Sequence, residues 1–148
     1  MPTMHLEIIT AERVVYSDDV DVLVAPGTEG ELGILPEHAP LLTALKPGEI
    51  RVVKEGRDQV MAVSGGFLEV LGNMVTILAD TAEHAEEIDE ERAQEAVRRA
   101  QERIASDPGD LDLERALKAL RRAQARVTVV RRRRPRGPAP TPPGAAES

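Results

Sequence analysis

Five arginines in the second half of the chain have the spacing of a site for a polyanion. Arg92, Arg99 and Arg103 fall within about 40° of one another on a helical wheel, beside a stripe of alanines. Arg122 and Arg126 lie one turn apart on a second helical segment. Because guanidinium groups form paired, charge-assisted hydrogen bonds with phosphate oxygens, two such helices side by side would suit a polyphosphate. Arg122 and Arg126 lie opposite the leucine stripe of their helix, however, and spacing alone favours an ordinary solvated face.

A serine followed by two glycines is the second candidate for chemistry. Ser64 stands in Ala-Val-Ser-Gly-Gly at 62–66, and Asp80 and His84 follow in the order that α/β-hydrolases use. A nucleophile elbow needs a strand before the serine and a helix after it. Residues 67–71 have the pattern of another strand, so we interpret Ser64 as a turn residue and expect no catalytic residue.

The remaining polar motifs indicate neither a metal site nor a nucleotide-binding loop. The three histidines, His5, His38 and His84, form no helical ligand pair, and the chain has no cysteine. The glycines spaced three apart at 27–33 follow neither the Walker nor the dinucleotide pattern, and no helix pattern comes after them. We therefore expect no metal and no required cofactor.

Three short apolar runs in the middle of the chain are predicted as strands. They cover 60–63, 67–71 and 74–79, and glycines separate them. Gly72-Asn73 leaves a two-residue connection of the kind that closes tight hairpins. Because the runs are apolar at consecutive positions, we expect both faces of these strands to be buried in the middle of a sandwich.

The residues before these runs are typical of the same β-structure. Further strand-like runs at 6–10, 14–16, 20–25 and 49–53 alternate with turn signals, as in all-β sandwiches. The segment 31–42 holds two prolines and five leucine or isoleucine residues. Since proline is excluded from central strands and helix interiors, we predict a shaped apolar loop, packed under its own sandwich or kept for a partner.

From about residue 81 the apolar period changes from two to about 3.6. Asp89 is a plausible N-cap, followed by acidic residues that favour the helix dipole. A second helix is predicted to begin at Asp110 or Asp112, which makes an αα-hairpin. The first helix has a mostly alanine stripe, so its burial contributes little free energy, and we expect a hairpin that can leave its docking surface.

The composition restricts the protein class. Tyr16 and Phe67 are the only aromatic residues, so the core must be aliphatic. The net charge is −7, no apolar run approaches the ~18 residues of a membrane span, and the N-terminus lacks the pattern of a signal peptide. The arginine-, proline- and alanine-rich segment 131–148 is predicted to be disordered. The arginine run in this segment has no aromatic residue near it to stack on bases, so we expect no nucleic-acid partner.

Several motifs together resemble the epsilon subunit of F-type ATP synthase. They are Gly-Glu-Leu-Gly-Ile-Leu-Pro at 30–36, His38, Pro40-Leu41, and Ala-Val-Ser-Gly-Gly-Phe-Leu-Glu-Val at 62–70. The order of a sandwich followed by a helical hairpin is similar too. The resemblance covers about residues 3–130 and does not include the tail. It implies ten strands, whereas the pattern alone gives about seven.

The resemblance implies a non-catalytic rotor subunit. Such subunits join the central-stalk subunit gamma to the membrane ring of c subunits and so couple proton flow to ATP synthesis. Their hairpin lies on the sandwich or extends into the alpha/beta catalytic head, where it inhibits ATP hydrolysis. For this chain we expect contacts with the rotor through the loop, at Glu31, Leu35, His38 and Leu41.

The resemblance also raises the expectation that the arginines bind ATP. Some bacterial members bind regulatory ATP through the motif Ile/Leu-Asp-x-x-Arg-Ala, which is complete here as Ile88, Asp89, Arg92 and Ala93. The family's further pocket positions are matched by Glu83, Arg99, Arg122 and Arg126. Guanidinium groups neutralise phosphates, so we expect no strict magnesium requirement.

The sequence thus predicts an N-terminal antiparallel β-sandwich followed by a C-terminal antiparallel two-helix hairpin. The expected parts are a rotor-binding sandwich at 1–84, a regulatory hairpin at 85–130 and a basic tail at 131–148. We expect a peripheral location on the cytoplasmic side of the cell membrane, without direct insertion. The alternative is a free-standing ATP-sensing module with no rotor.

Overall fold

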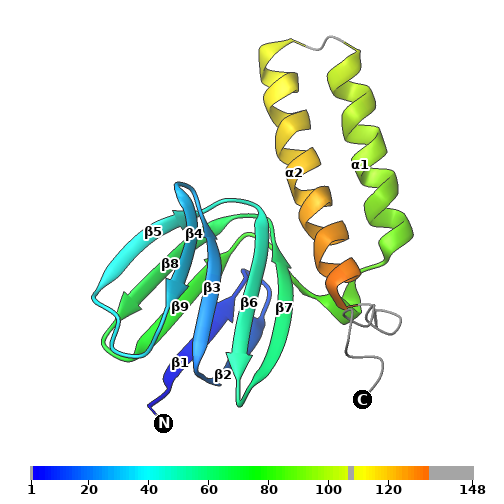
Figure 1. The fold of residues 1–148 in the computed structure, drawn as a ribbon. Coiled ribbons are helices and arrows are strands. Elements are labelled where there is room, and N and C mark those ends of the chain that lie inside the picture. The colour runs from blue at the N-terminus through cyan, green and yellow to red at the C-terminus, as the bar shows by residue number, and fades with distance from the viewer. Residues whose placement is uncertain (1, 107–108, 134–148) are drawn as a thin grey trace, which may run out of the picture.

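The computed structural model describes residues 2–106 and 109–133. It has two parts, a closed β-sandwich and a pair of antiparallel helices that stands on one side of it (Figure 1). This arrangement confirms the predicted fold class. The predicted tail lies mostly outside the described residues, but its first three positions continue the second helix to Arg133, so the helix is longer than expected.

The sandwich is a single ten-stranded sheet that curves around one core. Its strands are β1 Met4–Ile9, β2 Val14–Val20, β3 Val22–Gly27, β4 Gly30–Ile34, β5 Leu41–Leu45, β6 Gly48–Lys54, β7 Arg57–Val63, β8 Gly66–Leu71, β9 Met74–Ala79 and β10 Ala82–His84. The order is β10-β7-β6-β3-β5-β8-β9-β1-β2, with β4 paired to β3. All pairs are antiparallel except β1 with β9. The two ends of the sheet approach each other where His84 Nε2 on β10 lies 3.0 Å from the backbone oxygen of Val15 on β2. Nearby, Lys54 Nζ on β6 lies 2.5 Å from Asp18 Oδ2 on β2.

The core is aliphatic, as the scarcity of aromatic residues required. Alternate residues of each strand point inward, among them Leu6, Ile8, Leu68 and Ile77, which are fully buried. Phe67 is instead 57% exposed. The large aliphatic side chains of both halves of the sheet therefore form one continuous core.

The expectation that β8 and β9 are buried on both faces is wrong. Their inward residues are buried, but Phe67, Leu71 and Leu78 on the other face are more than half exposed. No further layer of the described chain covers this part of the sheet (Figure 1). The consecutive apolar residues of β8 and β9 therefore alternate between the buried core face of the sheet and an apolar face that is exposed on the surface.

The loop predicted at 31–42 is shorter in the structure, because both ends of this segment belong to strands. Residues up to Ile34 belong to β4, and Leu41 begins β5. The two prolines lie in the connection, where no ladder hydrogen bond is required of them. The predicted loop was too long at both ends, because a proline prevents backbone hydrogen bonding between strands only at its own position.

Two glycine turns have the conformations that the sequence required. Leu71 pairs with Met74 across Gly72-Asn73, and Gly72 has a φ of 60°. Gly66 has a φ of 144°, and a Cβ on it would lie 2.1 Å from Leu78 O. β8 can therefore lie against β9 only because residue 66 has no side chain.

The hairpin begins after a short 3₁₀ turn at Ala85–Glu87. Helix α1 runs over Glu90–Ala105 and helix α2 over Asp110–Arg133. Asp89 is the N-cap of α1, as predicted, and its carboxylate accepts a hydrogen bond from the Arg92 amide at 3.3 Å. The second helix begins at Asp110, one of the two predicted positions.

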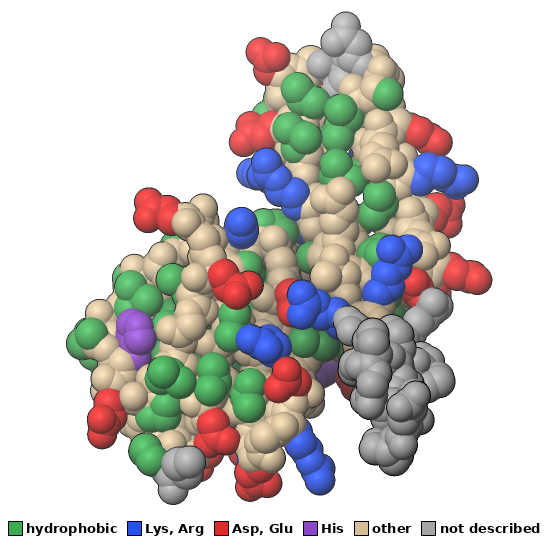
Figure 2. Space-filling model, in the orientation of Figure 1, with side chains coloured by type: hydrophobic (Ala, Val, Ile, Leu, Met, Phe, Trp, Pro, Cys, Tyr) green, Lys and Arg blue, Asp and Glu red, His purple; other side chains and the backbone are tan. Residues whose placement is uncertain are grey.

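A small second core joins the hairpin to the sandwich. It contains Ala62 of β7, Ala85, Ile88, Ala93 of α1 and Val129 of α2. We call these five residues the junction core. Figure 1 shows that the C-terminal end of α2 lies beside β7, while the tip of the hairpin projects beyond the sandwich. Figure 2 shows the same projection, with lysine and arginine side chains in blue on both helices.

Candidate functional site

A cavity of about 450 Å³ lies between the hairpin and the neighbouring edge of the sandwich. Its walls come from the end of β7, the connection into β10, and both helices. The lining residues are Ala62, Val63, Ser64, Asp80, Thr81, Glu83, Ala96, Ala119, Arg122, Ala123 and Arg126. Small side chains form much of the wall, and the charged groups are two carboxylates facing two guanidinium groups.

Arg126 is held toward the sandwich by an ion pair. Its Nε donates to Glu83 Oε2 at 2.8 Å, and the Arg126 side chain is 31% exposed. Arg122 lines the same cavity one turn earlier, with a more exposed side chain. Although Arg122 and Arg126 lie opposite the leucine stripe, this side of α2 faces the cavity and is not an ordinary solvated face. Helix α2 has two covered sides, because one packs on α1 and another faces the sandwich.

Arg92 and Arg99 are not among the residues that line the cavity. They lie four residues before and three residues after Ala96, so they project from the same side of α1 as that lining residue. Both side chains are exposed. Among the residues that the structure describes, neither guanidinium has a hydrogen bond or an ion pair. Both groups are therefore open to an anion.

The other three predicted ATP-site residues build the start of α1. Ile88 and Ala93 are buried in the junction core. Asp89 uses its carboxylate to cap the helix. The structure thus brings Glu83, Arg122 and Arg126 together at the cavity. It leaves Arg92 and Arg99 exposed on α1 outside the cavity lining, and Ile88, Asp89 and Ala93 build the start of that helix.

Ser64 does not have the surroundings of a nucleophile. Its Oγ accepts hydrogen bonds from the Thr81 amide at 2.9 Å and from Thr81 Oγ1 at 2.8 Å. The Nε2 of His84 lies 3.0 Å from the backbone oxygen of Val15 instead. The chain continues from Gly66 as strand β8, not as a helix. The geometry agrees with Ser64 as a turn residue.

The four predicted rotor-contact residues differ in their exposure. Glu31 is exposed on β4, and Leu35 is 57% exposed just after it. His38 is half-buried, and its Nδ1 lies 2.7 Å from the oxygen of Ala39. Leu41 packs against the sandwich core, so it is poorly placed for a contact. Its neighbour Leu42 is 70% exposed and is the better candidate.

An ion pair that no sequence pattern indicated joins the end of α2 to β6. Arg132 Nε lies 2.9 Å from Glu49 Oε2, although the pair is not aligned as a hydrogen bond. Burial raises the pKa of Glu49, and the nearby Arg132 opposes that shift. No local pattern could have indicated this pair, because its members lie far apart in the sequence.

Within 2–106 and 109–133, no group of three or more His, Cys, Asp and Glu residues is placed to hold a metal ion. Over the same residues, neither helix combines the length and the apolar character that crossing a membrane demands.

Comparison with known families gives a match over nearly all of the described chain. Residues 3–85 match the family described as ATP synthase, Delta/Epsilon chain, beta-sandwich domain. Residues 86–131 match the family described as ATP synthase, Delta/Epsilon chain, long alpha-helix domain. The two matches adjoin, so the sandwich and the hairpin correspond to the two domains of one kind of protein.

Similar curated proteins carry the same description. The ATP synthase epsilon chain of Desulforamulus reducens is 56% identical over 104 residues, which cover 70% of this chain and 79% of that protein. The ATP synthase epsilon chain of Roseiflexus sp. is 64% identical over 93 residues, which cover 63% of this chain and 67% of that protein. Epsilon chains are non-catalytic subunits of the ATP synthase complex.

Solved structures show the same fold. A chain in the Euglena gracilis mitochondrial ATP synthase, determined as OSCP/F1/c-ring, has a TM-score of 0.75 at 26% identity, covering 84% of this chain and 80% of that one. A chain in the Tetrahymena thermophila mitochondrial ATP synthase central stalk and c-ring has a TM-score of 0.55 at 17% identity, covering 88% of this chain and 96% of that one. The second likeness concerns the fold alone.

Proposed function

This chain belongs to the family of ATP synthase delta/epsilon chains, and we propose that it works as a rotor subunit of an F-type ATP synthase. In this role it turns with the central stalk and couples proton flow through the membrane ring to ATP synthesis in the catalytic head. The observation that carries the proposal is the adjoining pair of domain matches across residues 3–131. The chain itself performs no catalytic step.

The sandwich provides the attachment to the rotor, through gamma and the ring of c subunits. Leu35, directly after β4, and Leu42, near the start of β5, are exposed to solvent, and so is Glu31 on β4. Exposed leucines in a segment that two prolines hold in shape lose little conformational freedom on docking. These features support a protein contact here. The subunit would then sit at the cytoplasmic side of the cell membrane without entering it.

The hairpin provides regulation, with ATP as the ligand of the cavity. The cavity volume of about 450 Å³ lies within the usual range for small-molecule sites. Arg122 and Arg126 face it, and Arg92 and Arg99 are exposed on α1. Phosphate oxygens would share or replace the Glu83 carboxylate on Arg126 and neutralise the other guanidinium groups.

ATP bound in this cavity would touch both helices and the sandwich at once. It would therefore hold the hairpin against the sandwich, because a ligand stabilises the state in which it has more contacts. Without ATP the hairpin would be free to extend into the alpha/beta head and inhibit hydrolysis. ATP would in this way regulate hydrolysis through the position of the hairpin.

Isothermal titration calorimetry tests the ATP site. We expect one ATP per chain, little change on adding magnesium, and a loss of binding of at least tenfold in Arg126→Ala. Arg98→Ala is the matched control, since Arg98 is an exposed arginine of α1 that pairs with Glu95 at 3.8 Å and does not line the cavity. Absence of heat and of any thermal shift at millimolar ATP would reject ATP regulation.

Co-purification tests the rotor role separately. Affinity-tagged chain expressed with the other subunits should recover gamma and the catalytic head, and Leu35→Ser should weaken that recovery while leaving the sandwich folded. A chain that binds ATP but recovers no other subunit would instead support the free-standing ATP-sensing module.

A further inference from the structure

The sandwich contributes a polar wall to the cavity of about 450 Å³, built by two connections between strands. Ser64 comes from the connection between β7 and β8, and Asp80 and Thr81 come from the connection between β9 and β10. None of these three residues belongs to the ATP site predicted from the sequence. A ligand in the cavity would meet Arg122 and Arg126 on the hairpin, and hydroxyl and carboxylate groups on the sandwich.

Four hydrogen bonds hold the two connections of this wall together. The Ser64 amide donates to the Thr81 oxygen at 3.2 Å, and the Asp80 amide donates to the Gly65 oxygen at 3.0 Å. The amide and the Oγ1 of Thr81 both donate to Ser64 Oγ, at 2.9 and 2.8 Å. Because these bonds fix the backbone at Asp80 and Thr81, little conformational freedom is lost there when a ligand binds.

Asp80 is the carboxylate of the cavity that has no partner. Its Oδ2 lies over the bare backbone of Gly65, 3.5 Å from the place where a Cβ would stand on that glycine. Within the part of the chain that the structure describes, the Asp80 side chain has no hydrogen bond or ion pair, whereas Glu83 is paired with Arg126. Both oxygens of Asp80 are therefore available to a ligand.

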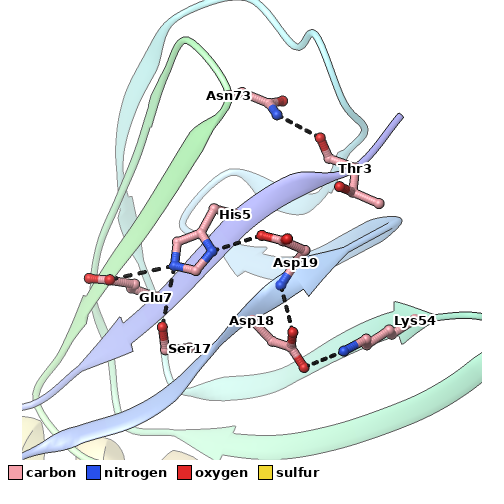
Figure 3. A network of polar contacts seen from close by, with 8 residues as sticks. All are labelled: Thr3, His5, Glu7, Ser17, Asp18, Asp19, Lys54 and Asn73. Carbon is pink, nitrogen blue, oxygen red and sulfur yellow. Dashed lines mark hydrogen bonds and ion pairs between the residues drawn. The ribbon is translucent and has the colours of Figure 1, made fainter. Parts of the chain in front are cut away.

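A paired carboxylate elsewhere in the sandwich shows the contrast. Figure 3 shows Asp18, which accepts a hydrogen bond from Lys54 Nζ at 2.5 Å. Asp80 and Arg122, by comparison, line one cavity and form no ion pair with each other among the described contacts. The cavity therefore keeps an acceptor and a cation apart. A ligand that carries both an anionic group and hydrogen-bond donors suits this arrangement.

We propose that Asp80 is a specificity-determining residue of this cavity, and that it accepts hydrogen bonds from the ribose hydroxyls of a bound nucleotide. The inference rests on the proposed ATP site and adds to it the selection of a nucleotide with an intact ribose. The phosphates bind Arg122 and Arg126, because a carboxylate repels them and guanidinium groups attract them. The nucleotide thereby bridges the hairpin and the polar wall of the sandwich.

The hydrogen-bonding chemistry of a carboxylate favours the sugar as its partner. An ionised carboxylate only accepts hydrogen bonds, so the group that it binds must donate them. In a nucleoside triphosphate the ribose is attached to the phosphates, and its two adjacent hydroxyls match the two oxygens of one carboxylate. An acidic side chain binds a ribose hydroxyl in this way at dinucleotide sites. The amino group of adenine also donates, but it lies farther from the phosphates.

Calorimetric titration of the full chain with ATP and with 2′,3′-dideoxyATP, which lacks both hydroxyls, tests the proposal. The unaltered chain should bind ATP more tightly by about tenfold or more, and in Asp80→Ala the two affinities should come within about threefold. The ratio is the readout, because removing a carboxylate also strengthens the general attraction for phosphates and changes both affinities together. Asp58→Ala, at an exposed aspartate of β7 outside this cavity, should keep the ratio of the unaltered chain.

The outcomes separate this proposal from the ATP site itself. Equal affinity of the unaltered chain for ATP and dideoxyATP, or a full preference for ATP in Asp80→Ala, would overturn the role of Asp80 while the ATP site stands. Inosine triphosphate lacks the amino group of adenine. If it binds weakly only when Asp80 is present, and dideoxyATP binds like ATP, the carboxylate accepts from the base and the ribose proposal is wrong. Absence of binding of every nucleotide to the unaltered chain would overturn both proposals. Circular dichroism of each variant checks that the sandwich is folded.

Discussion

The sandwich and the hairpin are held by cores of very different kinds. The sandwich core is built from large aliphatic side chains, such as Leu6, Leu68 and Ile77, that meet from all sides of a closed sheet. The junction core consists of three alanines, Ile88 and Val129. Ion pairs flank it, from Arg126 to Glu83 and from Arg132 to Glu49.

From this difference we expect a rigid sandwich and a hairpin whose position can change. Apolar burial contributes about 25 cal/mol per Å², so alanines contribute little and a leucine-rich core contributes much. The sandwich should remain folded whatever the hairpin does. Because the junction core is small, we expect that one bound anion or one lost ion pair could change the position of the hairpin.

Separating the two parts should have the largest effect. We expect the fragment 1–84 to fold alone and to melt cooperatively with a β-type circular dichroism spectrum, because the whole sandwich core lies between Met4 and Ala82. An insoluble or molten fragment would mean that the hairpin is part of the main core and that the comparison is wrong.

Shortening a buried side chain should lower the free energy of unfolding more in the sandwich core than in the junction core. It should also affect the whole chain in the first case and only the helices in the second. Leu68→Ala should cost about 2–5 kcal/mol of the free energy of unfolding and lower the melting temperature of the whole chain. Val129→Ala should cost about 1–2 kcal/mol, felt as faster hydrogen exchange in the helices only. Hydrogen-exchange mass spectrometry measures both. Faster exchange in the sandwich strands of Val129→Ala would show that the two cores act as one.

The local features of the fold were predictable because neighbouring residues determine them. The Asp89 cap depends on the amide of Arg92, three residues away, and the Gly72-Asn73 turn depends on its own backbone angles. Period alone also separated the strands from the helices. These predictions needed no knowledge of the layers that pack together.

What the sequence could not show is which layers meet. A helical wheel placed Arg126 opposite the leucine stripe, and only the sandwich on that side turns it toward Glu83. Similarly, the apolar run of β8 has one face in the core and Phe67 on the surface, because no further layer covers it. The cavity and the Glu49–Arg132 pair join distant segments, so their members carry no local signal.

The smallest expected effect is a pH dependence of hairpin docking through Glu49. Burial raises the pKa of this carboxyl in the docked state. Docking is therefore favoured while Glu49 is protonated, and this contribution is lost as pH rises through the raised pKa. Relative to the Glu49→Gln chain, exchange in α2 of the unaltered chain should become faster as the pH rises above the ordinary glutamate pKa of 4.5 and through the raised pKa. Glu55→Gln, at an exposed turn, should show the same pH dependence as the unaltered chain.

The central claim is that ATP controls whether the hairpin stays on a sandwich that does not change. The chain has no cysteine, so nitroxide labels on Glu29→Cys and Glu102→Cys report one distance between sandwich and hairpin by pulsed electron paramagnetic resonance. We predict a narrow distribution with saturating ATP, a broader one with longer distances without ATP, and no response to ATP in Arg126→Ala. Identical distributions with and without ATP in the otherwise unaltered labelled chain would contradict the claim.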